Sequence, residues 1–157
     1  MDNNLKQLQW TKMLQTQKKL REHRFKADVF ETKEECLDYI RNYLSSSNAV
    51  TMDGQLYNVD GNGNRVAALT YGPEHVLVIC GVNKIVKNLE EAELRVRNVA
   101  APANCVRLHK DSNPCTKTGT CMDCRLPSRI CSVGSVLFRS HVEGRIHVLL
   151  VNEELGY

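Results

Sequence analysis

The chain has 157 residues and a mass of 17.8 kDa, a length that suits one domain with a sizeable buried core. Its 21 Lys and Arg against 18 Asp and Glu leave a formal net charge of +3, scattered along the chain, so its composition gives no support to nucleic-acid binding. Apolar runs fall short of the roughly 20 residues of a membrane helix, and the start MDNNLKQLQW lacks the order of a signal peptide. We therefore expect a bacterial-type cytoplasmic protein without a membrane partner, in which thiols stay reduced.

The first segment predicts a helix followed by a strand. Residues 3–22 are rich in Gln, Lys and Leu, with Leu5, Leu8 and Leu14 close to helical spacing, which predicts an amphipathic helix. Residues 25–30, FKADVF, have the composition of a strand.

A capping box opens the next predicted helix, because the Thr32 hydroxyl can accept the N–H of Glu35 while the Glu35 carboxylate reaches back. The apolar residues that follow at helical spacing on one face are Cys36, Leu37, Ile40 and Leu44. Residues 47–59 then predict two short strands around Asp53-Gly54, a favoured hairpin turn because both residues tolerate a positive φ.

The middle of the chain alternates helices and strands. VAALTYG (66–72) predicts a short helix, and the continuous apolar run HVLVICG (75–81) predicts a strand covered on both faces. Asn88 and Glu91 form another capping pair, and Pro102 ends or kinks the helix that they open. The residues expected to face inward on this helix are Leu89, Ala92, Val96 and Val99.

Two more strands are predicted at 135–140 and 145–152, after a cysteine-rich loop. Strands that alternate with capped helices indicate an α/β fold with a mostly parallel sheet flanked by helices. We expect a single domain over residues 1–157, with the loop at 111–132 as its irregular part.

The loop CTKTGTCMDCRLPSRIC holds four of the seven cysteines in seventeen positions, with the spacing C-x5-C-x2-C-x6-C. Two thiolates separated by two residues can grip one metal, because a tight loop turns both sulfurs to the same side. Nearby cations, at Lys117, Arg125 and Arg129, would offset the charge of the thiolates. An odd number of cysteines in a reducing compartment argues against a disulfide framework. The predicted metal ligands are Cys115, Cys121, Cys124 and Cys131.

A zinc site and a [4Fe–4S] cluster both use four thiolates, so the ligand type leaves the metal open. One C-x2-C unit with uneven outer spacings favours an iron–sulfur cluster over a two-knuckle zinc site, with zinc as the alternative. The cysteines outside the loop, Cys36, Cys80 and Cys105, lie in apolar contexts and are interpreted as small buried hydrophobes.

A second candidate site is the segment DGNGNR (60–65), which lies between the predicted strand that ends near residue 59 and the predicted helix 66–72. Glycines let a backbone approach a ligand, N–H groups at a helix start favour an anion, and Arg65 can clamp a carboxylate or phosphate. Ligands gather at the carboxyl ends of parallel strands, which adds the residues after the strand 75–81. The candidate ligand-binding residues are Asp60, Gly61, Gly63, Asn64, Arg65, Asn83 and Lys84. A simple Asn/Gly turn and a solvated Lys84 are the alternatives.

The combination of these segments resembles the LUD (lactate-utilisation) domain family. The stretches that carry the resemblance are NVDGNGNRVAA, GVNKIV, RVRNVAAP, the four-Cys loop and IHVLLVNEELGY, over about Ser46 to Tyr157. The resemblance implies the α/β architecture shared with sugar-phosphate isomerases and CoA transferases. Some members are subunits of an iron–sulfur system that oxidises L-lactate to pyruvate, whereas the activity of the cysteine-bearing branch is not settled.

From this resemblance we expect an accessory redox or iron–sulfur-binding protein with a role in oxidation of lactate or a related hydroxy acid, working with protein partners in a redox assembly. The alternative is a zinc-stapled α/β module that binds an anionic metabolite without catalysis of its own. A second copy of the chain, in a homo-oligomer, is a further candidate partner. A stand-alone isomerase or CoA transferase ranks third, since Asp60 and Glu74 are its nearest candidate bases and neither has a visible partner.

One departure from the family pattern lies near Leu44–Ser47, where YIRNYLS runs almost directly into SSNAVT. Members of this branch carry a further stretch here, with a glycine-rich turn, a helix and a strand. Either the chain is a natural deletion or the given sequence omits a segment, and a deletion would expose much apolar surface unless a partner covers it. The glycine turn that would face Arg65 is also missing.

Overall fold

The computed structural model describes residues 3–38 and 43–157. The helices in this part of the chain are α1 (Asn3–Glu22), α2 (Lys33–Asp38), α3 (Asn64–Thr70), α4 (Leu89–Arg95), α5 (Ala101–Arg107) and α6 (Cys115–Thr118). The strands are β1 (Lys26–Phe30), β2 (Tyr43–Ser45), β3 (Ala49–Thr51), β4 (Leu56–Asp60), β5 (Val76–Gly81), β6 (Ile85–Val86), β7 (Val133–Leu137) and β8 (Ile146–Val151). A 3₁₀ turn (Val82–Lys84) follows β5, and a π-helical turn (Val96–Ala100) joins α4 to α5.

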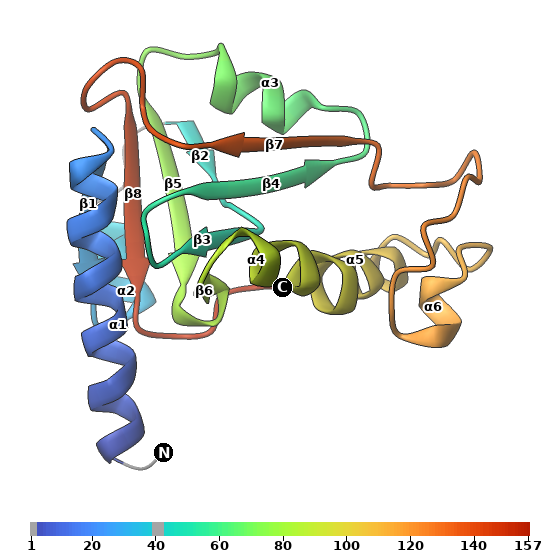
Figure 1. Ribbon diagram of the computed structural model, residues 1–157, viewed down its shortest axis with the longest axis horizontal. Helices are drawn as coiled ribbons and strands as arrows, with labels where there is room; N and C mark the ends of the chain where they lie inside the picture. Colours follow the sequence, from blue (N-terminus) through green and yellow to red (C-terminus); the bar gives the residue numbers. More distant parts are fainter. Residues whose placement is uncertain (1–2, 39–42) are drawn as a thin grey trace.

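The centre of the fold is a parallel sheet in the order β1-β8-β5-β2 (Figure 1). Every residue of β8 is buried, as expected for a strand covered on both faces. Met13 and Leu20 of α1 pack on one face of this sheet, and Cys36 of α2 packs against Leu149 and Val151 on the other. The predicted fold class, a parallel sheet flanked by helices, is confirmed.

A second sheet in the order β6-β3-β4-β7 runs across the first in Figure 1, and β3, β4 and β7 pair antiparallel. The predicted hairpin at Asp53-Gly54 joins β3 to β4, with a left-handed φ of 87° at Gly54. A Cβ on Gly54 would lie 2.6 Å from the carbonyl carbon of Lys19, so the turn packs closely on the end of α1. Glycine at this turn therefore also allows the second sheet to dock on the first helix.

The helix α1 is confirmed, but its buried face differs from the prediction. Leu5, Leu8 and Leu14 are exposed, whereas Met13 and Leu20 are fully buried. Between them lies Thr16, which can be buried because its hydroxyl donates to the Lys12 carbonyl at 2.9 Å. A polar residue with an internal partner thus completes the inward stripe, and a pattern of apolar residues alone misses it.

The second predicted helix is confirmed at its start and wrong at its end. Glu35 N–H donates to the Thr32 hydroxyl at 3.3 Å, and the Glu35 carboxylate accepts the Glu31 N–H at 3.2 Å. Leu44, predicted on the helix, lies in β2 beside β5 and is 49% exposed. Of the predicted inward residues, Ile40 and the side chain of Leu37 lie outside the described part of the structure.

The predicted exposure of apolar surface near Leu44–Ser47 is limited where the structure describes it. Strand β2 pairs with the first half of β5, from Val76 to Val78. Val78 and Cys80 of β5 are nonetheless fully buried. The sheet edge at β2 therefore leaves the centre of the sheet covered.

The long helical segment from α4 to α5 changes register at its middle. Asn88 accepts the Glu91 N–H at 3.0 Å, which confirms the predicted cap, and Ala92 and Val96 are buried as expected. The π-helical turn inserts an extra residue per turn, so Ala100 is buried in place of the predicted Val99, which is 48% exposed. Pro102 does not end the helical segment. It lies among the first residues of α5, directly after the π-helical turn that interrupts the regular helix.

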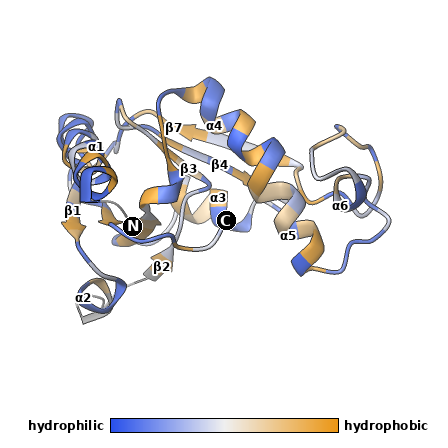
Figure 2. Cartoon of the chain, turned by 90° about the horizontal axis from the view of Figure 1, so that it is seen from below, coloured by the Kyte–Doolittle hydropathy of each residue, from blue (hydrophilic) through white to orange (hydrophobic). Residues whose placement is uncertain are grey.

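The loop with α6 lies at the opposite end of the molecule from α1 in both views (Figure 1; Figure 2). No described helix has the length and apolar character that crossing a bilayer requires.

Candidate functional site

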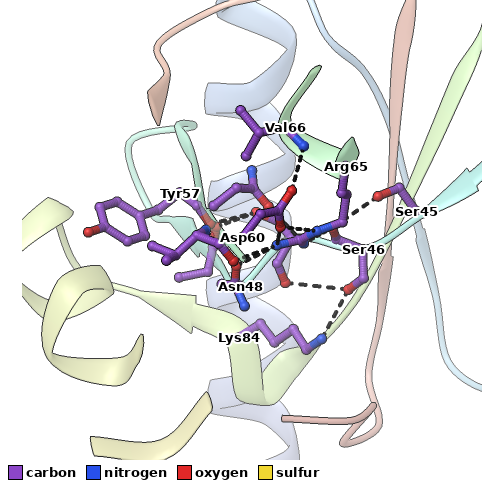
Figure 3. Close-up of polar contacts among 12 residues, drawn as sticks. Ser45, Ser46, Asn48, Tyr57, Asp60, Arg65, Val66 and Lys84 are labelled. Atoms are coloured by element: carbon purple, nitrogen blue, oxygen red, sulfur yellow. Dashed lines mark hydrogen bonds and ion pairs between the residues drawn. The ribbon is translucent and has the colours of Figure 1, made fainter. Parts of the chain in front are cut away.

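Arg65 at the start of α3 is the centre of a polar network under the predicted anion site (Figure 3). Its Nε and Nη2 both donate to Asp60 Oδ1, at 2.9 and 2.7 Å, and form an ion pair with this one carboxylate oxygen. Nη2 also donates to Asn48 Oδ1 at 2.7 Å, and Nη1 donates to the Ser46 carbonyl at 2.7 Å and Asn58 Oδ1 at 3.0 Å. The guanidinium thus ties the connection between β2 and β3 to β4 and α3, and its donors are committed to protein acceptors.

Asp60, at the end of β4, is committed in the same way. Its Oδ1 accepts from Arg65, and its Oδ2 accepts the Val66 N–H at 2.7 Å, inside the first turn of α3. The carboxylate is 7% exposed at its side chain. The other carboxylate considered from the sequence, Glu74, is exposed. Neither residue has the arrangement of a free catalytic base.

A cavity of about 680 Å³ opens beside this network. Gly61 and Asn64 line it together with Asp60 and Arg65, whereas Gly63 caps α3 with a left-handed φ of 75°. The cationic side chains that line the cavity are Arg65, Lys84, Arg107, Lys110 and Arg129. Asp60, already paired with Arg65, is the acidic counterpart in this lining. A cavity of this size and charge suits an anionic small molecule.

Lys84 reaches the same cavity from the carboxyl end of β5. Its side chain is 7% exposed, and Nζ donates to Ser46 Oγ at 3.0 Å (Figure 3). Burial lowers the pKa of Lys84; the nearby Cys80 thiol opposes this shift, while Arg95 and Arg65 add to it. The alternative of a solvated surface lysine is therefore wrong.

Asn83 holds the C-terminal segment instead of lining the cavity. Its Nδ2 donates to the Gly156 carbonyl at 2.9 Å, and its Oδ1 accepts the Leu155 N–H at 3.2 Å. Gly81 permits this close packing, because a Cβ there would lie 2.4 Å from the Glu153 carbonyl oxygen. Asn83 thereby places the tail over Lys84, and a Cβ on Gly156 would lie 3.7 Å from Lys84 Nζ.

The cysteines of the loop gather around a second, small cavity of about 20 Å³. The thiol-bearing residues that line it are Cys105, Cys115, Cys121, Cys124 and Cys131. Arg129 organises the loop around them, donating to the carbonyls of Cys131 at 2.7 Å and Cys124 at 2.6 Å. The four predicted cysteines therefore line one small cavity.

Cys105 is the residue of this cluster that the sequence did not reveal. It is buried on α5, where its sulfur accepts from Asn113 Nδ2 at 3.3 Å. Burial raises the pKa of the Cys115 thiol to about 11, and a hydrogen bond with Cys105 adds to the rise. Burial also raises the pKa of Cys131 to about 11, with the Cys121 thiol as the next cause. In the described residues, no group of three or more His, Cys, Asp or Glu side chains has the arrangement of a metal site.

The loop docks on the body of the protein through the π-helical turn. Ala101 N–H bonds to the Val96 carbonyl, and the next residue, Pro102, has no N–H to offer. The Arg97 carbonyl is therefore left without a helical donor, and it accepts the Cys121 N–H at 2.8 Å. Thr120 Oγ1 adds a bond to Asn98 Oδ1 at 2.6 Å. Proline thus creates the acceptor that positions the C-x2-C unit.

Comparison with known proteins agrees with this architecture. A crystal structure of a DUF162 family protein from Deinococcus radiodurans aligns with a TM-score of 0.54 and 12% identity, over 91% of this chain and 98% of that chain. At this identity the likeness shows the fold, which is that of the sugar-phosphate isomerases and CoA transferases. No curated protein matches the sequence. The model of the LUD domain matches residues 42–151, most of the chain, and the protein therefore belongs to the LUD domain family.

Proposed function

We propose that this protein is an accessory redox subunit that holds an iron–sulfur cluster in its cysteine loop and binds an anionic hydroxy acid, lactate or a relative, in the adjacent cavity. The observation that carries this proposal is a shared wall. Ala101, Arg129, Ile130 and Cys131 line both the small thiol cavity and the large cationic cavity. A redox centre and a bound anion at these places would be neighbours.

Four cysteine thiols are the type of donor that an iron–sulfur cluster uses, although in the described residues they do not have the arrangement of a metal site. The loop brings four thiols to one cavity, and Arg129 and the Arg97 carbonyl hold its backbone from either side. Burial raises the pKa values of the Cys115 and Cys131 thiols, and the neighbouring cysteines add to the rise, so thiolates here would need a compensating cation. When bound, a [4Fe–4S] cluster supplies one-electron chemistry.

The cationic cavity supports the second half of the proposal. Arg65 and Arg129 are held by several protein acceptors, whereas in the described part of the chain Arg107 donates Nε and Nη2 to Asn104 Oδ1 alone. We therefore assign an incoming carboxylate to Arg107 and Lys110 on the cavity wall. Arg107 is exposed and Lys110 is half-buried, which places positive charge on the cavity wall, while Lys84 lies deep in the same lining. A small hydroxy acid with one carboxylate matches this lining.

The test is anaerobic purification followed by reconstitution with iron and sulfide. We expect about four irons per chain and an absorption shoulder near ~400 nm. Cys124→Ser should lose both signals, whereas Cys36→Ala, which removes a buried thiol on α2 outside the loop, should keep them. Iron-free, colourless protein after reconstitution would remove the redox proposal.

A zinc-stapled module that binds an anionic metabolite is the second candidate, because four cysteine thiols also suit zinc. It predicts stoichiometric zinc in the purified protein and a lower melting temperature after treatment with a chelator. A melting temperature that ignores the chelator, in zinc-free protein, counts against it. In either case the anion cavity is unchanged, and protein partners in a redox assembly belong to the first candidate.

A further inference from the structure

The amine of Lys84 has unusual surroundings for a lysine. It lies at the carboxyl end of a central parallel strand, 7% exposed, with its side chain on the wall of the 680 Å³ cavity. Among residues 3–38 and 43–157, it forms no ion pair with a carboxylate. Asp60, the acid in this lining, is already held by Arg65 and the Val66 N–H.

The described neighbours of Lys84 orient the amine, and none of them is a carboxylate that would pair with it. Ser46 Oγ donates to the Ile79 carbonyl at 2.8 Å, so its lone pairs face Nζ at 3.0 Å (Figure 3). Arg95, fixed by bonds to the Asn83 and Asn48 carbonyls, adds a second positive charge nearby. Burial and cationic neighbours favour a neutral amine, which is the nucleophilic form.

We propose that Lys84 is a nucleophile that forms an imine with the carbonyl carbon of a 2-oxo acid bound in the cationic cavity. The nitrogen lone pair forms the C–N bond while the carbonyl oxygen takes a proton. Water then leaves from this carbinolamine, and the nitrogen releases its second proton as the C=N bond forms. The step is a condensation and requires neither oxidant nor reductant.

The choice of a 2-oxo acid rests on the proposed function, because oxidation of a 2-hydroxy acid yields a 2-oxo acid with the same carboxylate. Lys110 and Arg107, farther along the cavity lining, supply the charges for that carboxylate. The hydroxy acid lacks a carbonyl carbon at this position and would occupy the cavity without bonding to Lys84. The site would thus retain product covalently and reversibly and release the hydroxy acid freely.

The experiment is incubation of the intact protein with pyruvate and sodium cyanoborohydride, followed by peptide mapping by mass spectrometry. We expect one reduced pyruvate per chain, on the peptide that contains Lys84. Lys84→Arg should abolish this label, whereas Lys87→Arg, at an exposed lysine three residues on, should retain it. Excess lactate should slow labelling of the wild type by competition.

Labelling that spreads evenly over exposed lysines, or is absent from Lys84 in folded wild-type protein, would overturn the proposal. Peptide mapping of the wild type decides this even where Lys84→Arg proves unstable. The metal content of the same preparation is measured separately, so a failed imine with a full iron content leaves the redox proposal standing. An imine at Lys84 in iron-free protein would support the nucleophile proposal and remove the redox proposal.

Discussion

The carbonyl oxygen of Arg97 accepts the N–H of Cys121 at 2.8 Å, and the reason lies five residues beyond Arg97, at Pro102. Proline offers no N–H to that carbonyl in the π-helical register, so the bond to the cysteine loop has no competitor. The attachment of the candidate metal loop therefore depends on a residue of α5.

Pro102→Ala tests this dependence, because alanine supplies an N–H that competes for the Arg97 carbonyl. We expect the Cys121 amide to exchange with solvent roughly fivefold faster, since one hydrogen bond contributes about 1 kcal/mol. Hydrogen exchange followed by mass spectrometry measures it. Pro73→Ala, in the turn after α3, is the control and should leave exchange in the loop unchanged. Equal protection in both variants would mean that another contact holds the loop.

Arg65→Lys should lower the free energy of unfolding by about 2 kcal/mol, because a compact ammonium with three donors cannot replace the planar guanidinium, which bonds to Asp60, Asn48, Asn58 and the Ser46 carbonyl. Urea unfolding gives the value. Arg107→Lys makes the same exchange at an exposed position and should stay within about 0.5 kcal/mol of the wild type. If the two variants are equally stable, the hydrogen bonds of Arg65 do not contribute measurably to the stability of the fold.

Gly81→Ala should displace the C-terminal segment, because the new Cβ would lie 2.4 Å from the Glu153 carbonyl oxygen and 2.5 Å from the Leu155 nitrogen. Crowding against backbone atoms costs about 1–3 kcal/mol. We expect faster cleavage of the segment by a protease during limited digestion. The matched control is Gly134→Ala, where the nearest atom to a Cβ lies 3.9 Å away. An uncleaved segment in Gly81→Ala would contradict this close packing.

His147 gives the protein a stability that depends on pH. Burial lowers its pKa from the ordinary value of 6.5, while its hydrogen bond to Asp28 opposes the shift. The unfolded chain therefore binds a proton before the folded one as pH falls through 6.5, and stability declines in that direction. His147→Gln should flatten the slope of unfolding free energy between pH 7.5 and 5.5, whereas His141→Gln, at an exposed position, should not. An unchanged slope in His147→Gln would assign the dependence to other groups.

Local signals predicted most of the elements correctly. The capping pairs at Thr32 and Asn88, the Asp53-Gly54 turn and the apolar run of β5 act through neighbours in sequence, and each appears in the structure. The antiparallel pairing of β7 with β4 is a contact between distant segments, and alternation of strands and helices does not encode it.

The errors come from contacts that sequence spacing does not contain. Leu44 lies in a strand because β5 offers it a partner, and Val99 turns outward because the π-helical turn shifts the register of the helix. Cys105 precedes Cys115 by a helical turn and a loop, so its place among the other thiols appears once the chain is folded. The donors of Arg65 likewise find their acceptors on β4 and on the connection between β2 and β3.

The position of β8 has a consequence for the order in which the molecule folds. It lies between β1 and β5, and His147 pairs with Lys26 near the other end of the sequence. Pairings between such distant residues form slowly, because a long loop must close before any contact rewards it. Until Ile146–Val151 inserts, β1 and β5 have no common neighbour and the segment over Lys84 has no anchor. We therefore expect the parallel sheet to close before the C-terminal segment settles over Lys84, which would make completion of this side of the cationic cavity a late step in folding.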